Sequence, residues 1–275
     1  MKKILFLGDV VGRAGRNFIY DRMTAVREET QADFVIVNGE NSAGGSGINA
    51  DIARAFLSHG VDAVTLGDHV WDQRGFDSTV AKLSGICRPA NVPVGNPGAE
   101  YVILTDASGF RLLVFTVLGQ TFMRAKSSCP FRCASALLKR LAGTFDTAFV
   151  EIHAEATSEK IALGRYLDGR VAAVVGTHTH VATADECILP AGTAYQTDAG
   201  MCGGHDGVIG RNADSVIRCY LDGRPRHLEV CMTGVRLNGC LISYDEEQKK
   251  SVEISRFRLD RTERQERQAR QDRQD

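Results

Sequence analysis

Short apolar runs recur along the first two thirds of the chain, and each ends in a glycine or a polar residue. Runs that predict buried β-strands lie at 3–9, 34–40, 62–68, 112–119, 147–155 and 171–180. Stretches with the apolar spacing of helices lie between several of them, at 16–30, 49–60 and 133–143. Continuous apolar strands that alternate with amphipathic helices are typical of an α/β fold with covered sheets.

The pattern changes after residue 190. Stretches 192–200, 215–223, 227–245 and 251–260 predict strands joined by tight turns. Such antiparallel strands would complete a sheet, so we expect two sheets in the fold. At 275 residues, the chain is long enough for one large α/β domain or two small ones. Residues 259–275 form a charged, low-complexity tail, and its part from 260 onward has no aliphatic side chain larger than alanine.

Composition narrows the classes of function. The formal net charge of −1 gives no long-range attraction to nucleic acid or to an anionic membrane. No stretch approaches the roughly 20 apolar residues of a membrane span. The first apolar run stops at Gly8, so we expect a cytoplasmic protein. The eight cysteines form no CxxC pair, which favours free thiols over a disulfide framework.

Polar side chains gather where the predicted strands end. These residues are Asp9, Glu40, Asn41, Asp68, His69, His153, His178 and His180. In open α/β sheets, ligands lie beyond the carboxyl ends of the strands. Each residue alone has an ordinary explanation as a cap, turn or surface residue. Together, several carboxylates, an amide and imidazoles at one edge require positive charge, and a pair of divalent transition metals supplies it.

A dinucleotide-binding fold is the main alternative for the first strand, loop and helix. The glycines there are Gly8, Gly12 and Gly15, which do not follow the G-x-G-x-x-G spacing. Asp9 would also repel a phosphate at this position. The sequence therefore favours the metal site over a nucleotide cofactor.

The order of the motifs resembles that of a known family. Gly-Asp after the first strand, NGEN, GDH and GTHTH are similar to the motifs of calcineurin-like metallophosphoesterases. The longer motifs VNGENSAGGSGI, GDHVWD, EIHAEATSEK, GTHTHV and TDAGMCG resemble the bacterial group of two-metal 2′,3′-cyclic-nucleotide 2′-phosphodiesterases. This resemblance spans about residues 1–258. It implies a single domain over residues 1–258 with an α/β fold in four layers, in which two mixed β-sheets pack as a sandwich flanked by helices.

The resemblance also implies a role for each strand-end residue. Asp9 and His180 correspond to ligands of a first metal, and Glu40 to a carboxylate that bridges both metals. The second metal would be bound by Asn41, Asp68, His153 and His178. His69 corresponds to the general acid. The chain departs from the family pattern at Asp68, where asparagine is usual, and this puts the catalytic rate and the metal preference in question.

The implied activity is hydrolysis of 2′,3′-cyclic nucleotides, and other small phosphodiesters, to 3′-nucleotides. The nucleophile would be a hydroxide that bridges two transition-metal ions, with iron expected first and manganese or zinc as alternatives. The expected partner is a small nucleotide or phosphodiester, without membrane or extended nucleic-acid binding, and a homo-oligomer is left open. Other functions compatible with the motifs are a phosphomonoesterase or nucleotidase, a metal-binding regulator with little turnover, and an RNA nuclease.

Overall fold

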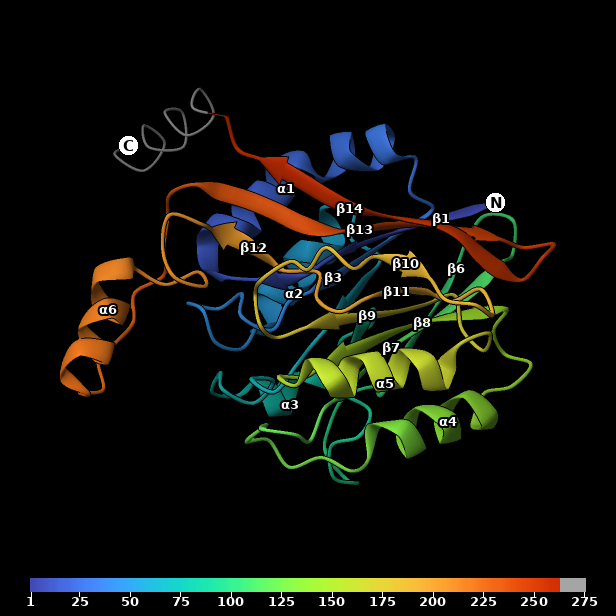
Figure 1. Ribbon diagram of the computed structural model, residues 1–275, viewed down its shortest axis with the longest axis horizontal. Helices are drawn as coiled ribbons and strands as arrows, with labels where there is room; N and C mark the ends of the chain where they lie inside the picture. The colour runs from blue at the N-terminus through green and yellow to red at the C-terminus, as the bar shows by residue number, and fades with distance from the viewer. Residues whose placement is uncertain (263–275) are drawn as a thin grey trace.

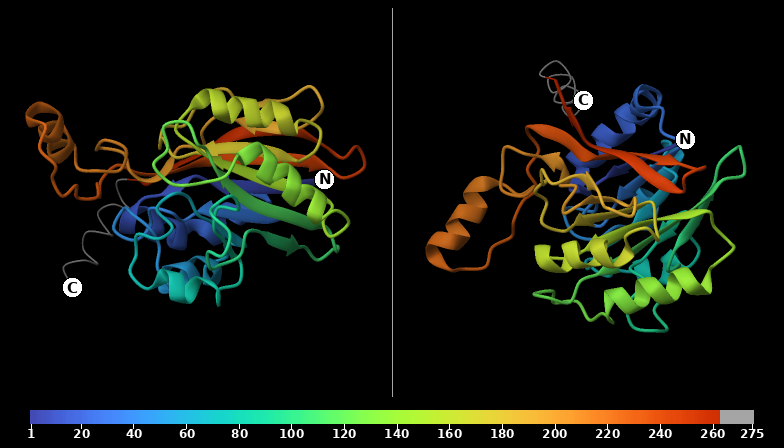
Figure 2. Two further views of the ribbon diagram at one scale, coloured as in Figure 1. Left: turned by 90° about the horizontal axis from the view of Figure 1, so that it is seen from below. Right: turned by 45° about the vertical axis from the view of Figure 1, so that its right-hand side comes forward.

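The protein folds into two β-sheets that face each other, with helices on their outer faces (Figures 1 and 2). This computed structural model describes residues 1–262. The α/β sandwich flanked by helices that the sequence predicted is thus confirmed.

The first sheet is mixed. Its strands in spatial order are β2 (Asp9–Val10), β12 (Met201–Gly204), β13 (Val235–Asp245), β1 (Lys2–Leu7), β3 (Phe34–Asn38), β4 (Ala63–Thr65) and β5 (Ile86–Cys87), and β14 (Lys250–Asp260) pairs with β13. Strands β1, β3, β4 and β5 are parallel, whereas β13 is antiparallel to both β1 and β14. The parallel arrangement brings the carboxyl ends of β1, β3 and β4 to one edge.

The second sheet is smaller and also mixed. Its strands in order are β10 (Cys187–Ile188), β11 (Ala194–Gln196), β9 (Ala173–Thr177), β8 (Thr147–His153), β7 (Arg111–Leu118) and β6 (Val102–Thr105). Strands β7, β8 and β9 run parallel. Their carboxyl ends lie at the same side of the molecule as those of the first sheet, because His153 and His178 contact Asp68 there.

Three apolar layers explain why the strands read as continuous hydrophobic runs. Along β1, Leu5 and Leu7 pack toward the helices, whereas Ile4 and Phe6 pack toward the second sheet. The outer layer of the first sheet is covered by α1 (Gly12–Thr30), α2 (Ala50–Ser58) and α3 (Phe76–Val80), and that of the second sheet by α4 (Pro130–Arg140) and α5 (Thr157–Leu167). A strand buried on both faces has no polar alternation.

The stretch 215–223 is a helix, so the strand predicted there is wrong. Helix α6 spans Ala213–Asp222 and projects from the body (Figures 1 and 2). The side chain of Asn212 accepts a hydrogen bond from the backbone N–H of Ser215, and Gly223 adopts a left-handed conformation (φ 66°). These are the signals that begin and end a helix, and here they outweigh the apolar, partly β-branched composition.

Regular structure continues past residue 258. Strand β14 runs to Asp260, and Arg261 donates a hydrogen bond to Asp21 of α1 (Nη2 to Oδ2, 2.6 Å). The Arg261 side chain is 7% exposed and its guanidinium lies over the ring of Phe18. This differs from the predicted start of the tail at 259. The prediction for residues 263–275 lies outside the described residues.

Within residues 1–262, no helix combines the length and hydropathy that a bilayer span requires.

Candidate metal centre

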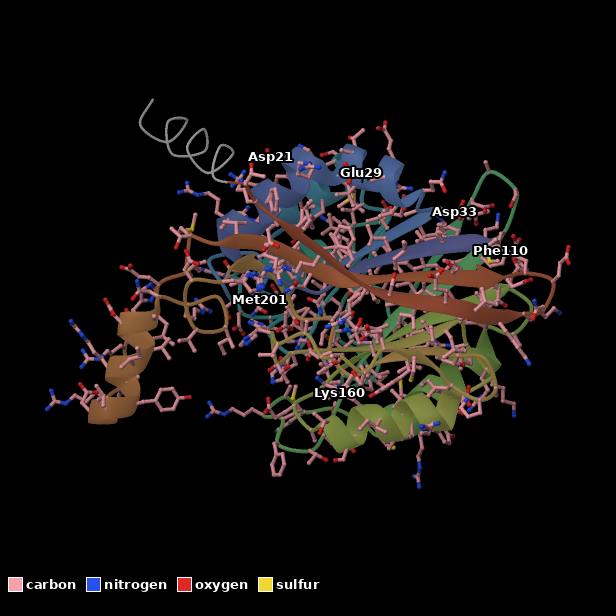
Figure 3. All side chains as sticks on the ribbon, turned by 45° about the horizontal axis from the view of Figure 1, so that its top comes forward. Asp21, Glu29, Asp33, Phe110, Lys160 and Met201 are labelled. Carbon is pink, nitrogen blue, oxygen red and sulfur yellow. The ribbon has the colours of Figure 1, made fainter. Side chains whose placement is uncertain are left out.

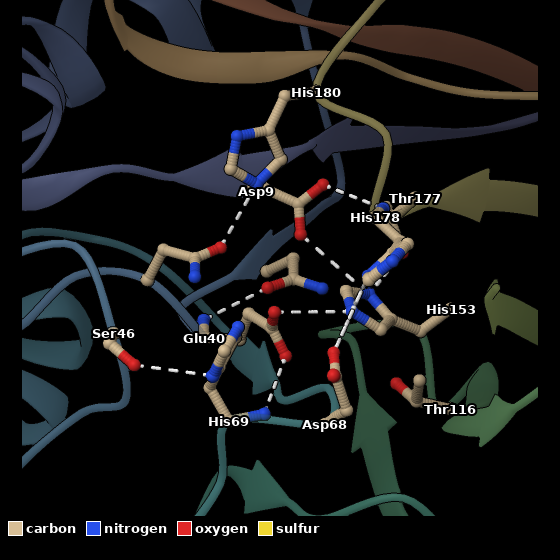
Figure 4. Close-up of polar contacts among 12 residues, drawn as sticks. Asp9, Glu40, Ser46, Asp68, His69, Thr116, His153, Thr177, His178 and His180 are labelled. Atoms are coloured by element: carbon tan, nitrogen blue, oxygen red, sulfur yellow. Dashed lines mark hydrogen bonds and ion pairs between the residues drawn. The ribbon is translucent and has the colours of Figure 1, made fainter. Parts of the chain in front are cut away.

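The polar strand-end residues come together from both sheets (Figure 4). The first sheet supplies Asp9 at β2, Glu40 and Asn41 after β3, and Asp68 and His69 after β4. The second sheet supplies His153, the last residue of β8, and His178 and His180 after β9. Both sheets therefore end at one cluster.

His153 lies at the centre of this cluster. Its side chain is fully buried, and its Nε2 atom lies 3.1 Å from Glu40 Oε1 and 3.0 Å from Asp68 Oδ1. His178 Nδ1 lies 3.2 Å from the same nitrogen. These four residues each offer one ligand atom, all within 4.8 Å of one another. Such a set of two carboxylates and two imidazoles can bind a divalent transition metal.

The outer nitrogens of both histidines are held by acceptors. His153 Nδ1 lies 2.8 Å from the hydroxyl of Thr177, which in turn donates to Glu151 Oε1 at 2.6 Å. His178 Nε2 lies 3.3 Å from Glu155 Oε2. Metal-binding histidines commonly donate their second ring N–H in this way, which fixes the tautomer and the ring orientation. The arrangement leaves His153 Nε2 and His178 Nδ1 directed at the cluster.

His180 lies beside this cluster and also has one ring nitrogen held by an acceptor. Its Nδ1 atom lies 3.0 Å from the carbonyl oxygen of Ile209, and its Nε2 atom lies 3.1 Å from Asn41 Oδ1. The Asn41 amide nitrogen donates to the carbonyl of Gly45, so the oxygen is the atom that faces His180. The structure thus places Asn41 beside His180, whereas the resemblance grouped it with Asp68, His153 and His178.

Asp9 contributes a buried carboxylate that is only half satisfied. Its Oδ2 atom accepts a hydrogen bond from the backbone N–H of His178 at 3.0 Å. Its Oδ1 atom is buried and has no hydrogen-bond partner among the described residues. Burial raises the pKa of Asp9 to about 7, against the attraction of His153. A buried carboxylate oxygen without a donor is a position that a cation would stabilise, so the site fits metal ions.

The charges in the cluster are strongly coupled. Burial alone would raise the pKa of Asp68, but hydrogen bonds from His153 and His178 outweigh it and lower that pKa. Burial likewise opposes a charge on His153, yet Glu40 and Asp68 raise its pKa well above the ordinary value. The carboxylates of the cluster therefore favour positive charge at its centre, which is the condition that a bound metal ion would meet.

His69 lies at the rim of the cluster, with its side chain 40% exposed. Its backbone N–H points to Glu40 Oε2 at 3.3 Å, and its Nδ1 atom lies 2.7 Å from Asp72 Oδ2 and 3.2 Å from Ser46 Oγ. Burial would lower the pKa of His69, but Glu40, Asp68 and Asp72 raise it. An oriented imidazole with a raised pKa is suited to general acid catalysis.

Comparison with known proteins identifies the family. The family model described as YmdB-like protein matches residues 5–257. The 2′,3′-cyclic-nucleotide 2′-phosphodiesterase of Bacillus subtilis (strain 168) is 40% identical over 258 residues, which cover 94% of this chain and 97% of that relative.

The chain belongs to the YmdB-like family.

Two solved structures support this assignment. A hypothetical protein from Thermus thermophilus is 37% identical with a TM-score of 0.87, and the match covers 94% of this chain and all (100%) of that one. A structure described as a novel phosphatase from Mycoplasma pneumoniae is 34% identical with a TM-score of 0.88, and the match covers 97% and 96% of the two chains. The family resemblance inferred from the motifs is confirmed, and so is the expectation of a hydrolase.

The strand predicted over 171–180 would require an extended backbone at both histidines. In this YmdB-like chain the backbone after β9 is not extended. Strand β9 ends at Thr177, and both His178 (φ 95°) and His180 (φ 66°) have left-handed backbones. Such conformations are unfavourable for residues other than glycine and persist where surrounding contacts hold them. The two imidazoles therefore reach different parts of the cluster because the backbone turns between them.

Sequence reasoning missed the residues that hold this loop. Asp198 accepts hydrogen bonds from the backbone N–H and the hydroxyl of Thr179, at 3.2 and 2.8 Å. Asp198 also pairs with Lys160 (2.7 Å), and the side chains of both are buried. Glu151, behind His153, was missed as well. A signal was present, because each is a charged residue inside a quoted motif and next to apolar positions.

Gly67 shows why the GDH motif begins with glycine. A Cβ atom at this position would lie 1.8 Å from Glu40 Oε2 and 2.5 Å from His153 Nε2. Neither atom can move without leaving the cluster. The backbone that follows β4 therefore passes directly beneath the candidate ligands, which only glycine permits.

Proposed function

We propose that this chain hydrolyses 2′,3′-cyclic nucleotides to 3′-nucleotides with the help of two transition-metal ions. One observation carries the proposal: His153, His178 and His180 each have one ring nitrogen held by an acceptor and the other directed at a carboxylate or amide oxygen of the cluster. The name of the Bacillus subtilis relative supports the choice of substrate.

The contacts support a division of the ligands into two groups. Asp68, His153 and His178 would hold one ion, and Asp9, Asn41 and His180 the other, with Glu40 between them. The contact of Asn41 with His180 supports its place in the second of these groups. Mixed nitrogen and oxygen ligands suit iron, manganese and zinc, and we propose iron as the native metal.

Each side chain has a definite task in this proposal. When bound, the metal ions would neutralise the phosphoryl oxygens and lower the pKa of a water molecule. His69 would protonate the departing ribose oxygen, a step typically worth about 10²–10⁴-fold in rate. Asp72 holds His69 Nδ1, so that Nε2 is the nitrogen left to donate the proton.

A phosphomonoesterase activity is the second candidate, because the Mycoplasma pneumoniae structure is described as a phosphatase. The same ligands would serve both reactions. A diester offers one negative charge, whereas a monoester offers about two near neutral pH. Comparing bis-p-nitrophenyl phosphate with p-nitrophenyl phosphate separates the two candidates.

Metal content and activity test the proposal together. We expect two ions per chain by elemental analysis of freshly purified protein, and hydrolysis of adenosine 2′,3′-cyclic phosphate to 3′-AMP. His178→Ala should lose one ion and most turnover. The matched control is His227→Ala, since His227 is an exposed histidine on the segment after α6. One ion or none in fully loaded, folded protein would contradict the two-metal site.

A further inference from the structure

A cavity of about 650 Å³ opens beside the candidate metal centre. His180 belongs to both, because its ring contacts Asn41 of the cluster while the segment His180–Ala182 forms one wall of the cavity. The other walls come from β12, β13, β14 and the loop after β12, in the part of the molecule that Met201 marks in Figure 3. Pockets for small organic ligands commonly have about 300–1,000 Å³.

The pairing of β13 with β14 places three arginines on this cavity. Arg256 and Arg258 are two positions apart on β14, so they point to the same face of the sheet. In the antiparallel register Arg258 lies opposite Asn238 and Asp260 lies opposite Arg236. Arg236, Arg256 and Arg258 all line the cavity as a result.

Acidic partners neutralise these arginines only in part. Arg256 Nε donates to Glu186 Oε1 at 2.8 Å, and Arg236 Nε donates to Asp260 Oδ1 at 2.6 Å. Arg258 shares Asp260 with Arg236. Among residues 1–262, three guanidinium groups thus share two carboxylates, which leaves an excess of one positive charge. Because Arg236 and Arg256 use Nε for these contacts, their terminal nitrogens have no acidic partner within the same residues.

His205 gives the floor of the cavity a neutral, polar character. Its Nδ1 atom lies 2.9 Å from the carbonyl of Gly203, and its Nε2 atom lies 3.0 Å from the side-chain nitrogen of Asn238. Nδ1 must therefore donate and Nε2 must accept, which is the neutral tautomer. Two residues of the GGHDG stretch (203–207), His205 and Gly207, thus help to shape this cavity.

We propose that the cavity binds a second phosphoryl group, attached to the 5′ oxygen of the same nucleoside whose 2′,3′-cyclic phosphate lies at the metal centre. This inference rests on the proposed function and names its substrate class. The two places are adjacent, because His180 contacts the cluster and also lines the cavity. Arginine binds phosphate oxygens through parallel hydrogen bonds, and an excess positive charge favours an anion there.

Two kinds of substrate carry this chemistry. One is a nucleoside 2′,3′-cyclic phosphate with a 5′-phosphate, and the other is an oligonucleotide that ends in a 2′,3′-cyclic phosphate. With the metal-loaded enzyme, kcat/KM should be about 5- to 10-fold higher for either of them than for adenosine 2′,3′-cyclic phosphate. A gain of this size is what a few partly exposed, charged hydrogen bonds to the 5′-phosphoryl group contribute. A gain for a dinucleotide shows that the cavity accepts a chain, and a gain confined to the 5′-phosphorylated mononucleotide shows that it does not.

The arginines should be responsible for this preference. Arg256→Gln, alone and with Arg258→Gln, should reduce the preference to below about 2-fold, with unchanged kcat on bis-p-nitrophenyl phosphate. The matched control is Arg140→Gln, because Arg140 on α4 is 57% exposed and paired with Glu100, much as Arg256 is 52% exposed and paired with Glu186. A preference that survives in both arginine variants would overturn the inference.

Product binding provides a readout other than turnover. In calorimetry, adenosine 3′,5′-bisphosphate should bind the wild-type protein about 5- to 10-fold more tightly than 3′-AMP does. In Arg256→Gln the two nucleotides should bind with equal affinity. Hydrolysis of cyclic nucleotides without any 5′-phosphoryl preference would refute the inference alone. Tighter binding of the bisphosphate without hydrolysis of any cyclic nucleotide would refute the proposed function alone.

Discussion

At the scale of single residues, the centre depends on atoms held in place by their neighbours. Asp68 illustrates this, because one carboxylate oxygen lies within 3.4 Å of nitrogens from both His153 and His178. An asparagine, usual in the family resemblance, would offer the same oxygen without the charge. The extra negative charge should strengthen metal binding and reduce the attraction for an anionic substrate.

Kinetics can test the role that we propose for His69. His69→Ala should retain both metals but lose about 10²–10⁴-fold in kcat on adenosine 2′,3′-cyclic phosphate, whose leaving alkoxide needs a proton. On bis-p-nitrophenyl phosphate the loss should stay below about 10-fold, because p-nitrophenolate needs little protonation. Steady-state kinetics on the two substrates, with His227→Ala as control, measure the difference. Equal losses would mean that His69 binds phosphate rather than donating a proton.

Most of the candidate centre was predictable from sequence because each residue directly follows a buried strand. Asp9, Glu40, Asp68 and His153 needed only the strand ends and the parallel order. The place of Asn41 was not predictable, since it depends on a hydrogen bond to Gly45 that the motif does not encode. The proposed division of the ligands between two metal ions rests on side-chain contacts of this kind.

At the scale of elements, the loop from Thr177 to His180 is the least regular part of the centre. Its left-handed residues are stabilised from below by the buried pair of Lys160 and Asp198. Helix α5 and strand β9 could be predicted from the apolar pattern, and both charged residues lie in quoted motifs. Their pairing could not be predicted, because it joins α5 to a residue after β11 that lies 38 positions along the chain. Helix α6 was predicted as a strand from its apolar residues alone. The residues that mark it as a helix, Asn212 and Gly223, lie just outside it at its two ends.

The Lys160–Asp198 pair should be strongly coupled to stability. Lys160→Met should lower the free energy of unfolding by about 3–5 kcal/mol, since it leaves Asp198 buried without its cation. Adding Asp198→Asn should recover part of this loss, and urea unfolding measures both. Lys139→Met is the control, because Lys139 is exposed on α4. A loss below about 1 kcal/mol would show that Thr179 and Gly200 suffice to satisfy Asp198.

At the scale of the whole molecule, a second buried pair joins the sheets far from the metal centre. Lys2 of β1 donates to Asp106, in the turn between β6 and β7, at 2.5 Å. Both side chains are nearly buried, 10% and 12% exposed. Burial alone would raise the pKa of Asp106, but hydrogen bonds from Lys2, Ser108 and Phe110 outweigh it and lower the pKa to about 2.

This pair should make stability depend on acidity in a definite direction. A depressed carboxylate pKa stabilises the fold above the unfolded value of about 4, and the stabilisation is lost as pH falls toward 2. Asp106→Asn should cost about 2 kcal/mol at pH 7 and progressively less from pH 4 to 2. Thermal unfolding across this range measures it, with the 94% exposed Asp51 (Asp51→Asn) as control. If the loss of stability in Asp106→Asn does not change with pH, the negative charge of Asp106 does not stabilise the fold.

The candidate metal centre takes its ligands from both sheets: Asp9, Glu40 and Asp68 from one, and His153 and His178 from the other. Metal ions bound there would act as a clasp across the sandwich. Each ion would gain affinity only when the two sheets are correctly docked, so docking and loading would support each other. A variant that loosens the apolar layer between the sheets would then release metal before it unfolds, and would lose activity while its helices are still intact.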